Sequence, residues 1–124
     1  MTALPRAILI TGCSSGIGLH CAHALRARGW GVFAACRKRE DCDRLIAEGF
    51  ESPQLDYADP ASIETALAEV LAATGGRLDA LFNNGAHACP GAVEDLPPGA
   101  LREIFEVNVI GWHDLTRRVI PVMR

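Results

Sequence analysis

Short runs of apolar residues alternate along the chain with longer stretches in which apolar positions recur at helical spacing. The run at residues 7–10 contains no polar residue, which is typical of a strand buried on both faces of a parallel sheet. We predict four strands, at residues 7–10, 31–36, about 52–56 and 78–82. Strands that alternate with helices indicate an α/β fold, here a doubly wound Rossmann-type parallel sheet with crossover helices.

Capping residues mark where the predicted helices begin and end. The first helix follows the first strand and stops at Gly29. Asp59 followed by Pro60 begins a later helix, because the carboxylate accepts hydrogen bonds from free amides and proline needs no amide partner. From about Gly99 an apolar stripe runs at helical spacing to the end of the chain, and Asn108 is its one polar member.

The first strand ends in a glycine-rich turn. Gly12 lets the backbone turn sharply, Gly16 keeps side chains away from a ligand, and Gly18 allows the next helix to pack close to the strand. Free amides at the helix start, together with the helix macrodipole, attract an anion. The hydroxyls of Ser14 and Ser15 add donors. From the residues alone, a phosphate site and a plain tight turn both stay open.

The residues after the second strand bear on the choice of nucleotide. An acidic residue at this place binds the ribose of NAD, whereas an arginine accommodates the additional phosphate of NADP. Here Cys36 is followed by Arg37, Lys38 and Arg39. A guanidinium binds phosphate through two parallel donors, and neighbouring cations strengthen the field. Together with the glycine turn this favours NADP, whereas without that turn a solvated basic loop is the simpler interpretation.

The spacing Thr-Gly-x-x-x-Gly-x-Gly at residues 11–18 resembles the cofactor motif of the short-chain dehydrogenase/reductase family. The matching residues are Thr11, Gly12, Gly16, Ile17 and Gly18, with the small polar residues Ser14 and Ser15 between them. The resemblance implies a nicotinamide cofactor, which Arg37 and its basic neighbours identify as NADP(H). It places the pyrophosphate at Ser14, Ser15 and Ile17, the 2′-phosphate at Arg37, the adenine amino group at Asp56 and the ribose near Asn83. A carboxylate that caps a turn fits Asp56 equally well.

Two further positions carry the resemblance. The family has Asn-Asn-Ala-Gly after the fourth strand, and this chain has Asn83, Asn84, Gly85 and Ala86, which exchanges the last two residues. Glycine at position 85 keeps the cofactor site small, and we expect the exchange to shift the loop slightly. Asn108 matches the family's catalytic asparagine, which holds an interrupted helix and a water that leads toward the active-site lysine. In relatives this helix often builds a dimer interface, so the resemblance also implies a homo-oligomer through the C-terminal helix.

The family's proton donor is absent from these residues. Its chemistry uses a serine, a tyrosine and a lysine four positions after the tyrosine, which lie beyond the final helix in relatives. Tyr57 is the one tyrosine and is followed four positions later by Ala61, and Lys38 is the one lysine. General acid catalysis needs a positioned donor. We therefore expect residues 1–124 to be a single dinucleotide-binding domain, truncated before this region and inactive alone.

The incomplete sheet has a consequence for its edge. We predict the strand order three, two, one, four, which leaves the last strand exposed where the family places another strand.

Composition argues against several classes of function. With a net charge of −3 and no basic stripe, the chain is not expected to bind nucleic acid. The four-residue apolar run near the N-terminus is too short for a signal peptide or a membrane span, so we expect a cytoplasmic protein without membrane contact. Five cysteines without a Cys-x-x-Cys pair predict reduced thiols and no metal site. Cys13 lies where a thiolate would be stabilised, but it is more simply a small turn residue.

Three hypotheses for function follow. The first is the cofactor-binding half of an NADP-dependent oxidoreductase, which moves a hydride between nicotinamide and a small carbonyl or alcohol substrate. The second is a non-catalytic NADP-binding sensing or interaction module, which the missing tyrosine and lysine favour. A methyltransferase is disfavoured, because its ribose usually requires an acidic residue where Arg37 stands.

Overall fold

The computed structural model describes residues 4–124 and confirms the α/β class. Its elements in chain order are β1 (Ala7–Ile10), α1 (Gly16–Ala27), β2 (Gly31–Ala34), α2 (Arg39–Ala47), α3 (Pro60–Thr74), β3 (Ala80–Phe82), the 3-10 helix η1 (Val93–Asp95), α4 (Pro98–Phe105), the π-helix η2 (Glu106–Gly111) and α5 (Trp112–Met123). The strands form one parallel sheet in the order β2-β1-β3. β1 lies in its centre, where Leu9 and Ile10 are fully buried.

The predicted third strand is wrong as a strand, although its segment lies where we expected it. Residues 51–54 run parallel to β2 and are joined to it and to the residues that follow it by two isolated bridges. Pro53 has no N–H to donate to the carbonyl of Ala34, which accepts the Ser52 hydroxyl at 2.6 Å. The ladder is interrupted there, so the sheet has three strands and not about four. The predicted order of the four segments is kept.

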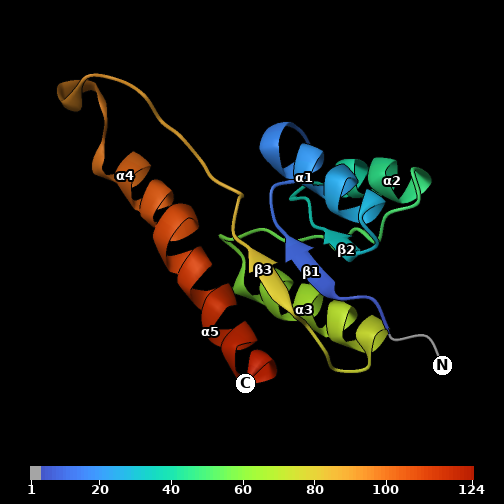
Figure 1. Ribbon diagram of the computed structural model, residues 1–124. Coiled ribbons are helices and arrows are strands. Elements are labelled where there is room, and N and C mark those ends of the chain that lie inside the picture. The colour runs from blue at the N-terminus through green and yellow to red at the C-terminus, as the bar shows by residue number, and fades with distance from the viewer. Residues whose placement is uncertain (1–3) are drawn as a thin grey trace.

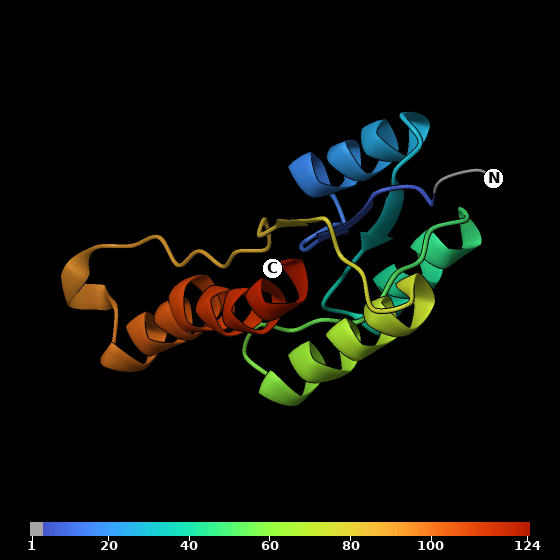
Figure 2. The ribbon, with the colours of Figure 1, turned by 60° about the horizontal axis from the view of Figure 1, so that its bottom comes forward.

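Helices cover both faces of the sheet, as in a doubly wound fold. α1 and α2 pack on one face with Ile8 and Ile10, whereas α3 and α5 pack on the other with Leu9 and Phe33 (Figure 1). Figure 2 shows α1 on the opposite side of the strands from α3 and α5. Alternate residues of β1 thus belong to two cores, which explains why this strand is uninterrupted in its apolar character.

The C-terminal helix is continuous in outline but changes its hydrogen-bonding pattern in the middle (Figure 1). α4 leads into the π-helix η2, which contains Asn108, and α5 continues beyond it with Pro121 inside. A Cβ atom at Gly111 would lie 2.5 Å from the Cβ atom of Tyr57, so only glycine permits this approach of the helix to the segment before α3. π-helical turns of this kind are frequent at functional sites.

β3 lies at the edge of the sheet away from β2, and its residues are only partly buried. Such an edge presents unpaired backbone groups to a further strand, as we predicted for the last strand. Within residues 4–124, no helix has the length and apolar character needed to cross a membrane. The cytoplasmic location stays a prediction.

Candidate functional site

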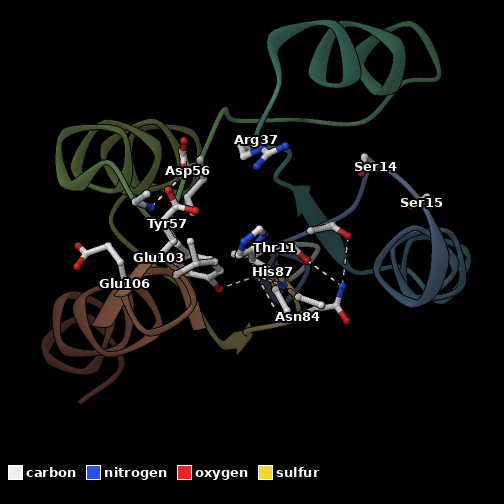
Figure 3. A pocket seen from close by; sticks show the side chains of 17 residues that line it. Thr11, Ser14, Ser15, Arg37, Asp56, Tyr57, Asn84, His87, Glu103 and Glu106 are labelled. Atoms are coloured by element: carbon white, nitrogen blue, oxygen red, sulfur yellow. Dashed lines mark hydrogen bonds between the residues drawn. The ribbon is translucent and has the colours of Figure 1, made fainter. Parts of the chain in front are cut away.

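A cleft of about 700 Å³ opens at the carboxyl ends of the strands. It is lined by the loops after β1, β2 and β3, by residues 55–58, and by one side of α4 and η2 (Figure 3). In doubly wound sheets, ligands bind outside the carboxyl ends of the strands. Six of the predicted cofactor residues line the cleft: Gly12, Ser14, Ser15, Arg37, Asp56 and Gly85.

The glycine turn has the conformation that its sequence predicted. Gly12 and Gly16 have φ angles of 67° and 62°, in the left-handed region that favours glycine. A Cβ atom at Gly12 would lie 2.6 Å from the Cα atom of Gly85, whereas one at Gly16 would meet no atom within 4 Å. A Cβ atom at Gly18 would lie 2.5 Å from the carbonyl oxygen of Gly12. Gly12 and Gly18 therefore allow close packing, and Gly16 keeps a space open.

The N-terminus of α1 follows this turn without a side-chain cap. Ser15 is the N-cap residue, and its hydroxyl accepts no hydrogen bond from the helix. The first turn of α1 carries no acidic side chain. Ile17 is largely exposed beside the turn and does not line the cleft. The free amides and the helix dipole therefore face the surroundings unopposed, which is the arrangement that attracts an anion.

Arg37 is the one cation of the basic run that lines the cleft. Figure 3 shows it on the loop after β2, above the space between the glycine turn and Asp56. Its backbone carbonyl accepts a hydrogen bond from Gln54 Nε2 at 3.1 Å, which fixes the loop. Arg39 instead donates to Gln54 Oε1 at 3.1 Å, and Lys38 is the N-cap residue of α2. Within residues 4–124, no carboxylate forms an ion pair with Arg37.

Arg44 of α2 supports the turn from outside, through a contact that has no local signal in the sequence. Its Nη2 donates to the carbonyl oxygen of Ser14 at 2.7 Å, and its Nη1 donates to Asp41 at 3.1 Å. The guanidinium thereby links α2 to the glycine turn across 30 positions of sequence.

Asp56 serves a turn and lines the cleft at once. Its Oδ1 accepts a hydrogen bond from the N–H of Ala58 at 2.9 Å, and its own N–H donates to the hydroxyl of Ser62 at 2.9 Å. The turn that precedes the N-terminus of α3 thus holds the carboxylate, which also borders the cleft (Figure 3). Both interpretations offered by the sequence are compatible with this position.

The side chain of Asn108 does not line the cleft but holds the loop that does. Its Oδ1 accepts the N–H of His87 at 2.8 Å, and its Nδ2 donates to the carbonyl oxygen of His87 at 2.7 Å. The amide thus pairs with the loop as a neighbouring strand would. Glu103 and Glu106, which the sequence analysis did not single out, line the cleft from α4 and η2 (Figure 3).

Comparison with known proteins identifies the family to which this chain belongs. The family model described as short chain dehydrogenase matches residues 6–124. The chain belongs to the short-chain dehydrogenase family. The oxidoreductase YbbO of Escherichia coli (strain K12), whose function is uncharacterised, is 38% identical over 120 residues, which are 97% of this chain and 45% of YbbO. The chain thus spans about half the length of the curated relatives it matches.

Solved structures of the short-chain dehydrogenase family agree with the fold. A structure of 3-ketoacyl-(acyl-carrier-protein) reductase from Brucella melitensis complexed with NADH has a TM-score of 0.85 and 28% identity, covering 96% of this chain and 50% of that one. An actinorhodin polyketide ketoreductase with NADPH has a TM-score of 0.88 and 28% identity, covering 99% of this chain and 49% of that one. Nicotinamide cofactors of both kinds therefore occur among these neighbours.

The loop after β3 carries Gly85 and Ala86 in exchanged order relative to the short-chain dehydrogenase motif, and hydrogen bonds fix its position. Thr11 Oγ1 accepts the N–H groups of Asn84 and Gly85, both at 2.9 Å, so the threonine ties the first loop to the third. The carbonyl of Gly85 accepts Trp112 Nε1 at 2.7 Å. No residue other than glycine has a positive φ angle in the described part of the chain, so Ala86 is not strained by the exchange.

Asn83 lies behind the cleft wall and does not line the cleft itself. Its Oδ1 accepts the hydroxyl of Tyr57 at 2.6 Å, and its Nδ2 donates to Thr116 Oγ1 at 3.1 Å. The Thr116 hydroxyl donates in turn to the carbonyl of Trp112 at 2.7 Å. Asn83 thus connects the loop after β3 with α5. Tyr57 could not be assigned to this site from the sequence, because an isolated tyrosine carries no signal of its partners.

The five cysteines are free thiols, as predicted. Burial raises the pKa of Cys13 from 9.0 to about 12 and that of Cys36 from 9.0 to about 11, and in both cases a neighbouring cysteine adds to the effect. Cys13 is therefore a buried turn residue and not an activated thiolate. Within residues 4–124, no group of His, Cys, Asp and Glu side chains is arranged to hold a metal ion.

Proposed function

We propose that this chain is the cofactor-binding half of an NADP-dependent short-chain oxidoreductase. The observation that carries the proposal is the position of Arg37, which borders the same cleft as the glycine turn and has no carboxylate paired with it in the described residues. NADP differs from NAD by a phosphate on the adenosine ribose, and a free guanidinium binds such a group through two charge-assisted hydrogen bonds.

The charges around the cleft support one orientation of the cofactor. Arg37 and the N-terminus of α1 lie on one side, and Glu103 and Glu106 lie on the other (Figure 3). Phosphates therefore belong near Arg37 and the glycine turn. In this proposal Ser14, Ser15 and Ile17 surround the pyrophosphate, Arg37 binds the 2′-phosphate, Asp56 lies at the adenine, Asn83 supports the wall at the ribose, and Gly12, Gly16, Gly18 and Gly85 leave the space free.

The residues present fit the cofactor but do not complete the reaction. When bound, the nicotinamide ring supplies or accepts the hydride that is exchanged with a carbonyl or alcohol carbon of a small substrate. Asn108 positions the loop that borders the cleft through its two hydrogen bonds to His87. Tyr57 is not a suitable acid, because burial raises its pKa to about 12 and its hydroxyl donates to Asn83. These 124 residues contain no tyrosine followed four positions later by a lysine, so in this proposal they bind the cofactor and do not donate the proton.

The second candidate function is a non-catalytic NADP-binding sensing or interaction module. It is favoured by the absence of any tyrosine and lysine spaced four positions apart in these residues. Both candidates share the cofactor site, and they differ in turnover. The protein that contains this segment is expected to oxidise NADPH, read at about 340 nm, when carbonyl compounds are added. An intact protein that binds NADPH but turns over no carbonyl or alcohol would favour the second candidate.

The specificity for NADP is tested by reversing one charge. We expect Arg37→Asp to weaken NADPH binding by about tenfold or more and to leave NADH binding much less affected, since a lost charge-assisted pair is worth about 1.5–3 kcal/mol. Arg39→Asp makes the same charge change in the same run, at a side chain that bonds to Gln54 instead. Fluorescence titration measures both variants. Equal losses for the two dinucleotides in Arg37→Asp would contradict the role of this residue.

We also propose that the chain self-associates through its C-terminal helix. Apolar side chains on α4, η2 and α5 are about half exposed: Leu101, Phe105, Val109, Ile110 and Ile120. Their exposure in a contiguous helical segment is typical of a surface that a partner covers. Sedimentation should show a concentration-dependent dimer, and a monomer at all concentrations would contradict the proposal.

A further inference from the structure

Tyr57 occupies a position where four segments of the chain meet. It lies outside any strand or helix, on the stretch between α2 and α3, yet only 6% of the residue's surface is exposed. The segments around it are the turn after β1, the loop after β3, the π-helix η2 and α5, whose Trp112 ring lies 6.3 Å from the tyrosine ring. Three of these segments also border the cleft.

Two glycines face this one ring. A Cβ atom at Gly85 would lie 3.1 Å from Tyr57 Cε2, and one at Gly111 would lie 3.0 Å from Tyr57 Cδ1 and 2.5 Å from its Cβ. Neither glycine has a positive φ angle, so the backbone conformation does not require glycine at either place. What crowds a side chain there is the tyrosine, through its ring at Gly85 and through its ring, its Cβ atom and its carbonyl oxygen at Gly111. The ring thus lies between the loop after β3 and the helix, close to both glycines.

The hydroxyl of Tyr57 has a fixed direction of hydrogen bonding. Thr11 Oγ1 already accepts two N–H groups, from Asn84 and Gly85. Its own hydrogen is therefore donated to Tyr57 Oη at 2.7 Å, and the hydrogen of Tyr57 goes to Asn83 Oδ1 at 2.6 Å. The chain of donors runs from the first loop through the tyrosine to the third loop. Burial of this hydroxyl makes an unpaired partner costly.

We propose that Tyr57 is a positioning residue of the cofactor cleft and that Gly85 is coupled to it. A methyl group at position 85 would lie 3.1 Å from the ring, so the ring or the loop would have to shift to admit it, which accounts for the order Asn-Asn-Gly-Ala in this chain. The hydroxyl holds the glycine turn and the loop after β3 in one arrangement. This inference rests on the proposed function, because the cleft that Tyr57 positions is the proposed dinucleotide site.

A double-mutant cycle tests the coupling. Gly85→Ala should weaken NADPH binding by about fivefold or more while Tyr57 is present, and the same substitution beside Tyr57→Val should cost less than about twofold, within the range that contacting residues show. Gly99→Ala is the matched control, since a Cβ atom there meets nothing within 4 Å and the φ angle is not positive. Equal losses from Gly85→Ala in both backgrounds would overturn the coupling.

Tyr57→Phe separates the ring from the hydroxyl and guards against a valine variant that fails to fold. The ring remains, so the cost of Gly85→Ala should persist beside Tyr57→Phe. The hydroxyl is lost, so Thr11 and Asn83 each lose a partner, and NADPH binding should weaken severalfold. Full wild-type affinity of Tyr57→Phe would overturn the role assigned to the hydroxyl.

A spectroscopic measurement distinguishes positioning of the cleft from general stability. Tyr57 is the only tyrosine of the chain, so ¹³C-labelling of tyrosine at the ring carbon next to oxygen gives a single resonance. Saturation with NADPH should shift this resonance in step with the fluorescence titration. Binding without any shift would overturn the proposal. If neither NADPH nor NADH binds, the proposed function fails, and the positioning role fails with it. The steric coupling between Tyr57 and Gly85 is then measured from the thermal unfolding temperatures of the four proteins of the cycle: the unmodified chain, Gly85→Ala, Tyr57→Val and the double variant.

Discussion

At the scale of single residues, the glycines of the first turn have separate tasks. Gly12 is required twice, because its φ angle is 67° and a Cβ atom would collide with Gly85. Gly16 shares the left-handed conformation but borders open space. The motif thus combines a glycine that close packing requires, Gly12, with one whose backbone conformation favours glycine and whose missing side chain leaves open space, Gly16.

We expect Gly16→Ala to lower dinucleotide affinity by about tenfold while lowering stability only by the cost of a left-handed alanine, about 1–2 kcal/mol. Gly75→Ala is the matched control, because Gly75 has a φ angle of 69°, meets nothing within 4 Å and lies away from the cleft. Urea unfolding and fluorescence titration measure the two quantities. Unchanged affinity in Gly16→Ala would show that no ligand approaches this place.

At the scale of elements, the π-helix η2 places Asn108 against the loop after β3. The side chain pairs with both backbone groups of His87, and Gly111 in the same turn lies against Tyr57. A loop that borders a cleft without regular structure is thus fixed from the helix. This arrangement makes η2 a support for the site and not merely an irregularity of a long helix.

Asn108→Ala should therefore loosen the loop. It leaves the N–H and the carbonyl of His87 without their partners, which costs about 1–3 kcal/mol if water does not replace them fully. Hydrogen exchange of peptides that cover residues 85–90 is expected to accelerate, and dinucleotide binding to weaken. Asn108→Asp keeps an acceptor for the N–H of His87 and should have a smaller effect. Exchange rates equal to those of the unmodified chain would contradict the support that we assign to Asn108.

At the scale of the whole molecule, buried acids that must keep their protons link stability to pH. Burial raises the pKa of Cys13 and of Tyr57 to about 12 and that of Cys36 to about 11. These groups ionise in the unfolded chain near 9.0 for the thiols and 10.0 for the tyrosine. Their stabilising contribution is complete below those values, and it is lost as pH rises toward the pKa of the folded state.

The free energy of unfolding should consequently fall between about pH 9 and pH 12, by up to about 1.4 kcal/mol per pH unit for Cys13 alone. Urea unfolding at about pH 8 and about pH 10.5 measures the decline, and Cys13→Ala should make it shallower. The same slope with and without the Cys13 thiol would show that this group does not cause the loss.

The sequence predicted features that depend on neighbouring residues and missed those that join distant ones. The glycine turn and the order of the strand segments follow from spacing and apolar runs, as does the start of α3 at Pro60. The prediction of a third strand was wrong because Pro53 has no N–H group. The ladder with β2 therefore lacks one backbone hydrogen bond, and only isolated bridges remain.

The missed residues of the site are long-range partners. Arg44 meets Ser14 across 30 positions, and Tyr57 meets Thr11 across 46. Neither contact leaves a periodic trace in the sequence. The exchanged Gly85 did indicate a local change, and its physical reason is the Tyr57 ring beside it, which is distant in sequence.

The proposed preference of this cleft for NADP over NAD is measured by a fluorescence titration of the chain with NADPH and, in parallel, with NADH. Saturable binding with about tenfold or greater preference for NADPH is the result that a guanidinium on the 2′-phosphate predicts. Equal affinity for the two dinucleotides, or tighter binding of NADH, would contradict the role of Arg37. No binding of either would contradict the cofactor site itself.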